Sequence, residues 1–249
     1  MSDFNYGILT ETAHRPWPVP DGPWVMTQTW NDLLFAHWPV PSDRLRELVP
    51  SPFDLDLFDG QAWIAVVPFH MTNVSPRIVP ALPGISAFPE LNVRTYVRVG
   101  DKPGVFFFSL DAGSAVAAGA ARALLNLPYF SADMKVETSG RRVEYSSRRR
   151  SLPAAEFRGS YQAEGTPRVA VRGTLEHFLT ERYCLYAVDH AKRAYRLEIH
   201  HPPWPLESAG ADVQVNTMAA AVGIDLPDTA PLLHFAKRLD VVCWAPDRI

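Results

Sequence analysis

The chain has 249 residues, of which 47% are hydrophobic and 20% are charged, and its net charge is −3. This balance is typical of a folded globular protein and argues against a disordered chain. With this net charge, the chain lacks the excess of basic residues that is typical of proteins that bind nucleic acid. No apolar run approaches the ~18–20 residues that a membrane span needs. We therefore expect a cytoplasmic protein that binds neither nucleic acid nor membrane.

The first part of the chain predicts an arm and then the start of a β-rich domain. Residues 1–24 contain HRPWPVPDGP and predict a proline-rich arm without regular structure, anchored by Trp17. No internal repeat or linker divides residues 25–249, so we expect a single domain there. The elements predicted up to residue 88 are a strand Val25–Pro39 bent near Asn31 and Asp32, a helix Asp43–Val49 capped by Ser42, a turn at Asp59-Gly60 into a strand Ala62–Phe69, and a long loop Met71–Phe88.

The stretch Phe88–Gly113 predicts two strands joined by a turn at residues 101–104. It reads FPELNVRTYVRVGDKPGVFFFSLDAG, which is rich in residues that favour strands but also carries many polar side chains. A buried charged group costs free energy unless it is paired. The polar cluster is therefore either a satisfied structural network or a binding site.

The second half of the chain predicts short strands and a few short helices. In chain order they are a helix Ala115–Leu125, strands Ser131–Thr138, Arg142–Arg149 and Glu156–Gln162, a helix Leu175–Thr180, strands Cys184–Val188 and Ala194–His200, a short helix between Asn216 and Gly223, and a strand Leu239–Trp244. This pattern predicts a mainly β fold with a few short helices (α+β) and an antiparallel, barrel-like or sandwich core. The basic run Arg141–Arg150 is interpreted as a solvated hairpin edge.

Alternation along the two central strands indicates which polar side chains share a face. If the polar faces of the two strands coincide, one surface carries Asn92, Arg94, Tyr96, Ser109 and Asp111. An arginine on such a surface favours a ligand carboxylate, because the guanidinium fork matches that group. The alternative is an ion pair of Arg94 with Asp111 or Glu90 that only braces the sheet.

Neither a metal nor a cofactor is predicted. Cys184 and Cys243 are the two cysteines, without CxxC spacing, and the histidines follow no HxH or HExxH pattern. His200 and His201 are adjacent, so their side chains on a strand would point to opposite faces. No GxGxxG, phosphate-binding loop or GxSxG motif occurs.

Three stretches of the sequence resemble a known family. They are TWNDLLFAHWPVP at Thr29–Pro41, FDGQAWIAVVPF at Phe58–Phe69, and ELNVRTYV with PGVFFFSLDA in the central pair of strands. Together they resemble the YqjF-like family, also called DUF2071, over Thr27–Trp244. That family is related to acetoacetate decarboxylase, so the resemblance implies a twisted, largely antiparallel β-barrel or cone around a hydrophobic cavity. It implies no particular activity.

The resemblance also bears on the chemistry of the site. Acetoacetate decarboxylase forms a Schiff base through a lysine whose pKa is lowered by a neighbouring lysine. At the matching run after Pro128, this chain has Tyr129 and Phe130. Because neither side chain can form a Schiff base, we do not expect the decarboxylase reaction.

The candidate site residues predict a small-molecule site with acid–base chemistry. Glu90 is the candidate general acid or base, because burial raises the pKa of a carboxyl group toward neutrality. Alternatively, Glu90 only accepts hydrogen bonds from backbone N–H groups in a structural role. Tyr129 would donate a hydrogen bond to a substrate oxygen, and Arg94 would hold a carboxylate. We expect a lyase or isomerase acting on a carbonyl- or carboxylate-bearing metabolite, or alternatively a non-catalytic protein that binds an apolar small molecule. Assembly of the chain with a second copy of itself stays open.

Overall fold

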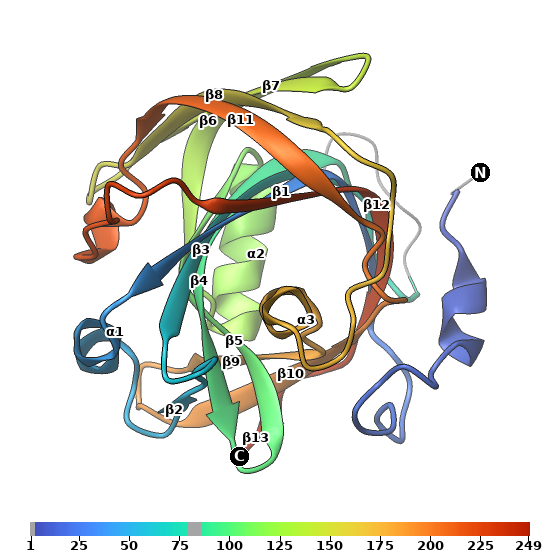
Figure 1. Cartoon of the computed structure of the whole chain (residues 1–249). Helices are drawn as coiled ribbons and strands as arrows, with labels where there is room; N and C mark the ends of the chain where they lie inside the picture. Colours follow the sequence, from blue (N-terminus) through green and yellow to red (C-terminus); the bar gives the residue numbers. More distant parts are fainter. Residues whose placement is uncertain (1–2, 79–85) are drawn as a thin grey trace.

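The structure is a computed structural model that describes residues 3–78 and 86–249 (Figure 1). Within these residues it is mainly β, as the sequence predicts. The helices are α1 (Ser42–Leu48), α2 (Ala115–Leu125) and α3 (Leu175–Thr180), with short 3-10 helices η1 (Tyr6–Thr10) and η2 (Ala220–Val222). The strands are β1 (Met26–Val40), β2 (Asp54–Leu55), β3 (Ala62–Pro76), β4 (Phe88–Val99), β5 (Lys102–Ala112), β6 (Tyr129–Ser139), β7 (Arg142–Arg149), β8 (Glu156–Ala163), β9 (Cys184–Val188), β10 (Ala194–His200), β11 (Leu206–Asn216), β12 (Leu232–Cys243) and β13 (Asp247–Arg248).

Hydrogen-bonded strands close the sheet on itself in two rings. The first ring runs through β1, β3, β4, β5, β9, β10 and β12, and the second runs from β5 through β6, β7, β8 and β11 to β12. In Figure 1 the strands found only in the second ring lie at the top, and β9 and β10 lie at the bottom. The strands β12, β1, β3, β4 and β5 belong to both rings. Because side chains alternate along a strand, each shared strand contributes one face to each ring.

Irregularities in two shared strands decide which side chains face which ring. The pairing of β1 with β3 changes register after Asn31, and Asp32 adopts a φ of +48°. This confirms the bend predicted near these two residues. On β5, Phe108 is an extra residue opposite β4. Such a bulge turns the side chains that follow it to the opposite face of the sheet.

The bulge at Phe108 corrects the expectation that all the polar side chains share one surface. Phe107 lies opposite Arg94 and faces the first ring, whereas Ser109 lies opposite Val93 and faces the second ring together with Asp111. The polar faces of the two central strands therefore do not coincide. The prediction of a common surface does not hold for Ser109 and Asp111.

Most predicted elements are present, and the differences have local causes. β3 continues through Pro76 where the sequence predicts a loop, while residues 79–85 of that loop lie outside the described residues. Ser42 is the first residue of α1 and not its cap, because no side-chain hydrogen bond caps this helix. The central strands turn at Gly100-Asp101, earlier than expected, because Gly100 adopts a φ of +61°. β11 is not among the predicted strands, although Ala209, Ala211, Val213 and Val215 alternate with small or polar residues along it.

A buried ion pair joins β5 and β7 in the second ring. Arg149 on β7 donates to Asp111 on β5, with 2.7 Å from Nη2 to Oδ1 and 3.0 Å from Nε to Oδ1, and neither side chain is exposed. The Arg149 guanidinium also lies over the Phe130 ring, 3.9 Å from its centroid. Hydrogen bonds between the same two groups satisfy charges that would be costly to bury alone. The prediction of a solvated edge for residues 141–150 is therefore wrong for Arg149.

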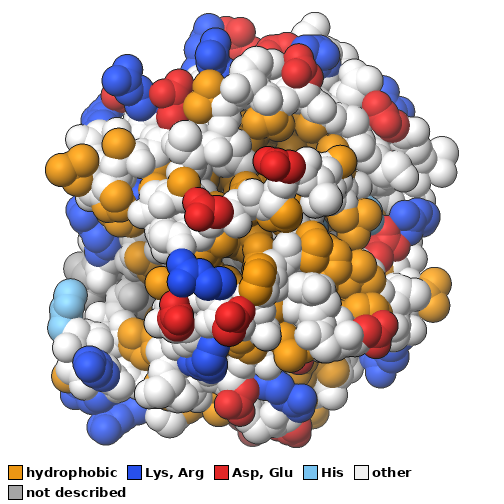
Figure 2. Space-filling view, turned by 60° about the vertical axis from the view of Figure 1, so that its left-hand side comes forward, with side chains coloured by type: hydrophobic (Ala, Val, Ile, Leu, Met, Phe, Trp, Pro, Cys, Tyr) orange, Lys and Arg blue, Asp and Glu red, His pale blue; other side chains and the backbone are white. Residues whose placement is uncertain are grey.

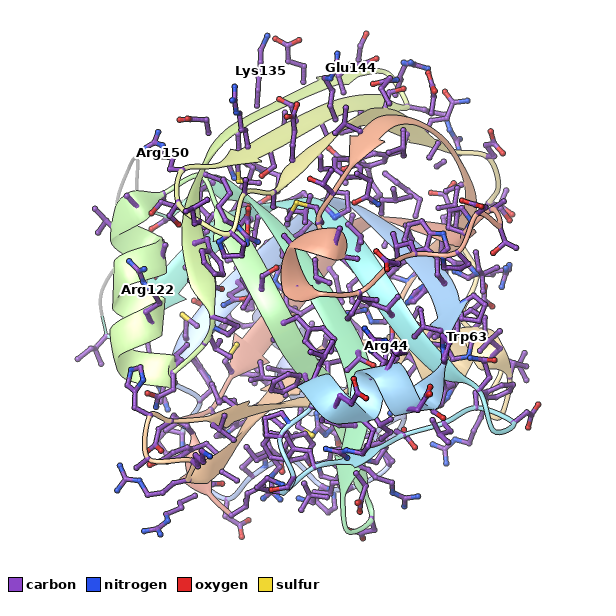
Figure 3. All side chains as sticks on the ribbon, turned by 90° about the vertical axis from the view of Figure 1, so that its left-hand side faces the viewer. Arg44, Trp63, Arg122, Lys135, Glu144 and Arg150 are labelled. Carbon is purple, nitrogen blue, oxygen red and sulfur yellow. The ribbon has the colours of Figure 1, made fainter. Side chains whose placement is uncertain are left out.

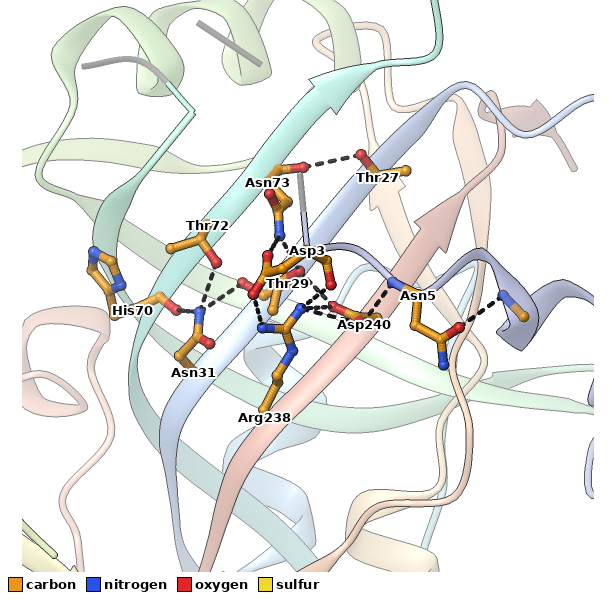
Figure 4. A network of polar contacts seen from close by, with 11 residues as sticks. Asp3, Asn5, Thr27, Thr29, Asn31, His70, Thr72, Asn73, Arg238 and Asp240 are labelled. Atoms are coloured by element: carbon orange, nitrogen blue, oxygen red, sulfur yellow. Dashed lines mark hydrogen bonds and ion pairs between the residues drawn. The ribbon is translucent and has the colours of Figure 1, made fainter. Parts of the chain in front are cut away.

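The N-terminal arm packs along the body of the protein and includes η1. Trp17 donates its Nε1–H to Glu198 at 2.7 Å, which confirms its predicted role as an anchor. Arg15 donates to the same carboxylate oxygen at 3.2 Å. A second attachment is the polar network between the arm and β1, β3 and β12 (Figure 4), where the Asn5 N–H donates to Asp240 at 3.1 Å. Further hydrogen bonds attach the arm, among them Trp244 Nε1–H to the Gly22 carbonyl oxygen and His200 Nε2 with that of Ile8.

Charged side chains of both signs are mixed on the surface. Figure 2 shows a face where hydrophobic side chains gather in the middle, with acidic and basic side chains spread among and around them. Lys135 and Arg150 project outward from the second ring (Figure 3), and each pairs with an acidic neighbour. Among the described residues, no helix has the length and apolar character to cross a membrane.

Asp111→Asn should lower the free energy of unfolding by about 3–5 kcal/mol, because it leaves the charge of Arg149 buried without a partner. Asp133→Asn is the matched control, since it breaks an exposed pair with Arg150 and should cost less than about 1 kcal/mol. Chemical denaturation of the two variants measures both effects. Equally small losses would contradict a stabilising role for the buried pair.

Candidate functional site

A cavity of about 100 Å³ lies inside the first ring. Each strand of that ring contributes to its wall, so closure of the ring creates the cavity. Most of the wall is apolar, with side chains such as Leu33, Val67, Phe107, Leu185 and Ile199. The polar residues on the wall are Gln28, Glu90, Asn92, Arg94, Tyr129, Thr180, Arg182 and His201. A few polar groups in an apolar cavity are typical of a small-molecule site.

Glu90 and Tyr129 form a hydrogen-bonded pair on this wall. Glu90 lies on β4, and Tyr129 at the start of β6 donates its hydroxyl to Glu90 Oε2 at 2.8 Å. Burial raises the pKa of Glu90 to about 7, although the hydrogen bonds from Tyr129 and Asn92 act in the opposite direction. Burial also holds the pKa of Tyr129 well above its ordinary value. The pair therefore combines a carboxyl group that titrates near neutral pH with a hydroxyl that keeps its proton.

Arg94 is a buried charge without an ion-pair partner among the described residues. Its side chain lies on the cavity wall, the residue is 8% exposed, and its Nε–H has no partner among the described residues. Neither ion pair considered from the sequence forms in the described part of the chain, because Asp111 pairs with Arg149 and Glu90 binds Tyr129. Arg94 is therefore available to an anion in the cavity.

A second arginine, Arg182, lies at the same part of the wall. The Cζ atoms of Arg182 and Arg94 lie 4.9 Å and 5.9 Å from the ring centroid of Tyr96. Arg182 Nη1 donates to Asp56 Oδ2 at 2.5 Å, whereas its Nη2 has no partner in the described chain. The cavity thus has a basic end, formed by two guanidinium groups near the same tyrosine ring.

The Tyr96 hydroxyl is held by two hydrogen bonds. It donates to the carbonyl oxygen of Leu179 at 2.8 Å and lies 2.6 Å from His37 Nε2. A hydroxyl has one proton, so we assign the Nε2–H of His37 as the donor to Tyr96. Burial holds the pKa of His37 well below its ordinary value, and this imidazole is therefore neutral. The positive charge at this end comes from the two arginines.

The residues predicted as a site are divided between the two rings. Those on the cavity wall are Glu90, Asn92, Arg94 and Tyr129. Tyr96 lies beside the wall, and Ser109 and Asp111 face the second ring. Arg182 is a wall residue that the sequence does not predict, because it follows α3 and reaches the cavity only where the chain returns to β4. Nothing in its local sequence links it to Arg94.

The cavity wall contains none of the four lysines of the chain. Lys102 pairs with Glu198 at 2.8 Å, and Lys135 with Glu137 at 2.7 Å. A lysine Schiff base is therefore not available inside this cavity. Among residues 3–78 and 86–249, no three or more His, Cys, Asp or Glu side chains lie so that they could hold a metal ion.

Solved structures with a similar fold include acetoacetate decarboxylases and related enzymes. An acetoacetate decarboxylase-like enzyme from Sphingomonas wittichii RW1 aligns with a TM-score of 0.62 at 12% identity, covering 95% of this chain and 97% of that one. Acetoacetate decarboxylase from Legionella pneumophila aligns at 0.60 and 11% identity, covering 100% and 98%. The enduracididine biosynthesis enzyme MppR, solved with pyruvate, aligns at 0.61 and 10% identity, covering 95% and 93%. At these identities the likeness shows a shared fold, which confirms the acetoacetate decarboxylase-like architecture.

Comparison of sequences gives a nearer relationship. The chain is 50% identical to the protein YqjF of Bacillus subtilis (strain 168) over 226 residues, which are 91% of this chain and 93% of that protein. The model of the family DUF2071, described as an uncharacterized conserved protein, matches residues 27–240. The chain therefore belongs to the DUF2071 family.

Proposed function

We propose that this protein binds a small, largely apolar carboxylate in the first-ring cavity and carries out acid–base chemistry on it without a Schiff base. The observation that carries the proposal is the Arg94 guanidinium, which lies in an apolar wall without a carboxylate partner in the described chain. A buried charge costs free energy unless it is paired, and the planar guanidinium matches a carboxylate. A carboxylate on the ligand would supply the missing partner.

Glu90 and Tyr129 would supply the acid–base chemistry. With a pKa of about 7, Glu90 is ionised in part of the molecules at neutral pH and can accept a proton. In its ionised form it would take a proton from the carbon next to a ligand carbonyl and later return it. The Tyr129 hydroxyl, which donates a hydrogen bond to Glu90 in the structure, would instead donate a hydrogen bond to the enolate oxygen that forms. Proton transfer of this kind typically accelerates a reaction by about 10²–10⁴-fold. The reaction class is that of an isomerase or lyase.

The proteins that share the fold support the proposed substrate class. MppR is solved in complex with pyruvate, which carries a carbonyl and a carboxylate. Acetoacetate, in the name of the Legionella pneumophila enzyme, carries both groups as well. The fold alone does not imply a function, so the residues of this cavity have to carry the argument.

Arg94→Met should remove carboxylate binding. A thermal-shift screen of small carboxylates with apolar chains tests this, because a ligand at about 100 times its Kd stabilises a protein by about 2.7 kcal/mol. Arg98→Met is the matched control, since Arg98 lies further along β4 and is exposed. Ligands that stabilise the wild type, Arg94→Met and Arg98→Met equally would contradict a role of Arg94 in binding the carboxylate. They would favour a non-catalytic protein that binds apolar molecules.

Glu90→Gln should remove a pH dependence of stability. Burial raises the pKa of Glu90 from its ordinary 4.5 to about 7. The folded protein then binds more protons than the unfolded chain, so the stability of the wild type relative to the variant should fall as the pH rises from 4.5 to about 7 and stay constant above that. A shift of this size corresponds to about 3 kcal/mol.

Chemical denaturation across this pH range gives the measurement. Glu137→Gln is its control, because Glu137 is exposed and should leave the pH profile of the wild type unchanged. Parallel profiles for the wild type and Glu90→Gln would contradict a raised pKa at this site.

Proton exchange separates an enzyme from a passive binder. A bound keto acid incubated in D₂O should exchange the protons next to its carbonyl faster with the wild type than with Glu90→Gln or Tyr129→Phe. Loss of the corresponding proton NMR signals measures the rate. A ligand that binds through Arg94 and shows no enzyme-dependent exchange would contradict the acid–base role and leave binding as the function.

A further inference from the structure

We infer that the cavity accepts a ligand with one negative charge and discriminates against a ligand with two, and that Asp56 sets this limit by neutralising Arg182. The inference rests on the proposed carboxylate site and narrows its substrate class to monocarboxylates with a neutral far end. It follows from the charges on the cavity wall and on the groups that pack against it.

Two permanent charges lie on the described wall, and both are positive. The ionisable residues there are Glu90, Arg94, Tyr129, Arg182, His201 and Cys243. Burial lowers the pKa of His201 and raises the pKa of Cys243 to about 12, so both side chains are neutral near pH 7. Tyr129 keeps its proton for the same reason. Glu90 changes its charge near neutral pH, which leaves the two arginines as the fixed charges.

Within the part of the chain that the structure describes, Arg182 has a carboxylate partner and Arg94 has none. Arg182 Nη1 lies 2.5 Å from Asp56 Oδ2, and the side chains are 5% and 15% exposed. Glu181, outside the described wall, accepts hydrogen bonds from the Trp204 backbone N–H and from the Tyr183 hydroxyl. The Glu181 carboxylate acts on His201 and forms no ion pair with either arginine among the described residues. The charge left for a ligand is therefore the single charge of Arg94.

A second carboxylate on the ligand would find no partner at either end of the cavity. At the basic end, Arg94 and Arg182 lie near the same ring of Tyr96, and Asp56 already compensates Arg182. At the other end, an added carboxylate would meet Glu90, and two carboxylates in a desolvated site repel each other. A neutral carbonyl or hydroxyl fits there, because it can exchange hydrogen bonds with Glu90 and Tyr129. The geometry therefore favours a ligand with one anionic end and one neutral end.

Pentanoate and pentanedioate are suitable probes, because they have the same chain length and differ in one carboxylate. Calorimetry at neutral pH should show that the wild type binds pentanoate more tightly than pentanedioate, on the order of tenfold or more. Asp56→Asn keeps the size of the side chain, removes its charge and frees Arg182. The preference for pentanoate should fall on the order of tenfold in this variant. Asp133→Asn, which removes an exposed aspartate from a similar pair, should keep the wild-type preference.

The remaining outcomes overturn the inference in distinguishable ways. Equal binding of the two probes by the wild type, with both lost in Arg94→Met, would overturn the charge limit and leave the proposed carboxylate site intact. An unchanged preference in folded Asp56→Asn would overturn the role of Asp56. If neither probe binds the wild type, the proposed function fails and this inference fails with it.

A second variant keeps the test decisive if Asp56→Asn does not fold. Arg182→Gln leaves Asp56 as an uncompensated negative charge beside the wall. Pentanoate binding should then weaken on the order of tenfold although Arg94 is intact. An unchanged Kd in Arg182→Gln would overturn the inference.

Discussion

Five strands of this protein have to serve two interiors at once. The strands β12, β1, β3, β4 and β5 belong to both rings, and side chains alternate between the faces of a strand. One face of each lines the cavity, and the other packs into a core that contains Tyr145, Phe157 and Tyr161. A shift of one residue would exchange the two faces, so the bulge at Phe108 and the bend at Asp32 decide the character of both interiors.

The two rings treat a buried arginine in opposite ways. In the second ring, Arg149 donates hydrogen bonds to Asp111 through Nε and Nη2, and this pair is closed to solvent. In the first ring, Arg94 faces a cavity and has no such partner in the described chain. The first arrangement is what a structural charge requires, and the second is what an anion-binding charge requires. Arg182 lies between these cases, because Asp56 neutralises it and one of its N–H groups stays unpaired.

The fold shared with acetoacetate decarboxylase holds different chemistry in this chain. Tyr129 contributes a hydroxyl to the cavity wall and binds Glu90. The lysines of the chain lie away from this wall, and burial raises the pKa of Glu90 to about 7. A site of this kind can move protons and hold an anion, whereas it cannot form an imine with its ligand. On the proposed function, the same architecture would carry acid–base chemistry through other groups.

Strand alternation, turns and the polar residues of the central strands were sufficient to predict the mainly β fold and to select Glu90 and Arg94, whereas Tyr129 was selected through the resemblance to the family. These signals are local, because a strand of Val, Phe and Tyr that carries a glutamate and an arginine is unusual whatever surrounds it. The register between β4 and β5 could not be predicted from the sequence, because the extra residue Phe108 makes the side chains of Ser109 and Asp111 face the second ring. The sequence by itself determined the types of side chain and the family to which the chain belongs. Only the tertiary structure decided which charges are paired, because Arg149 and Asp111, like Arg182 and Asp56, are far apart in the sequence and come together through the pairing of the strands that hold them or lie next to them in the chain.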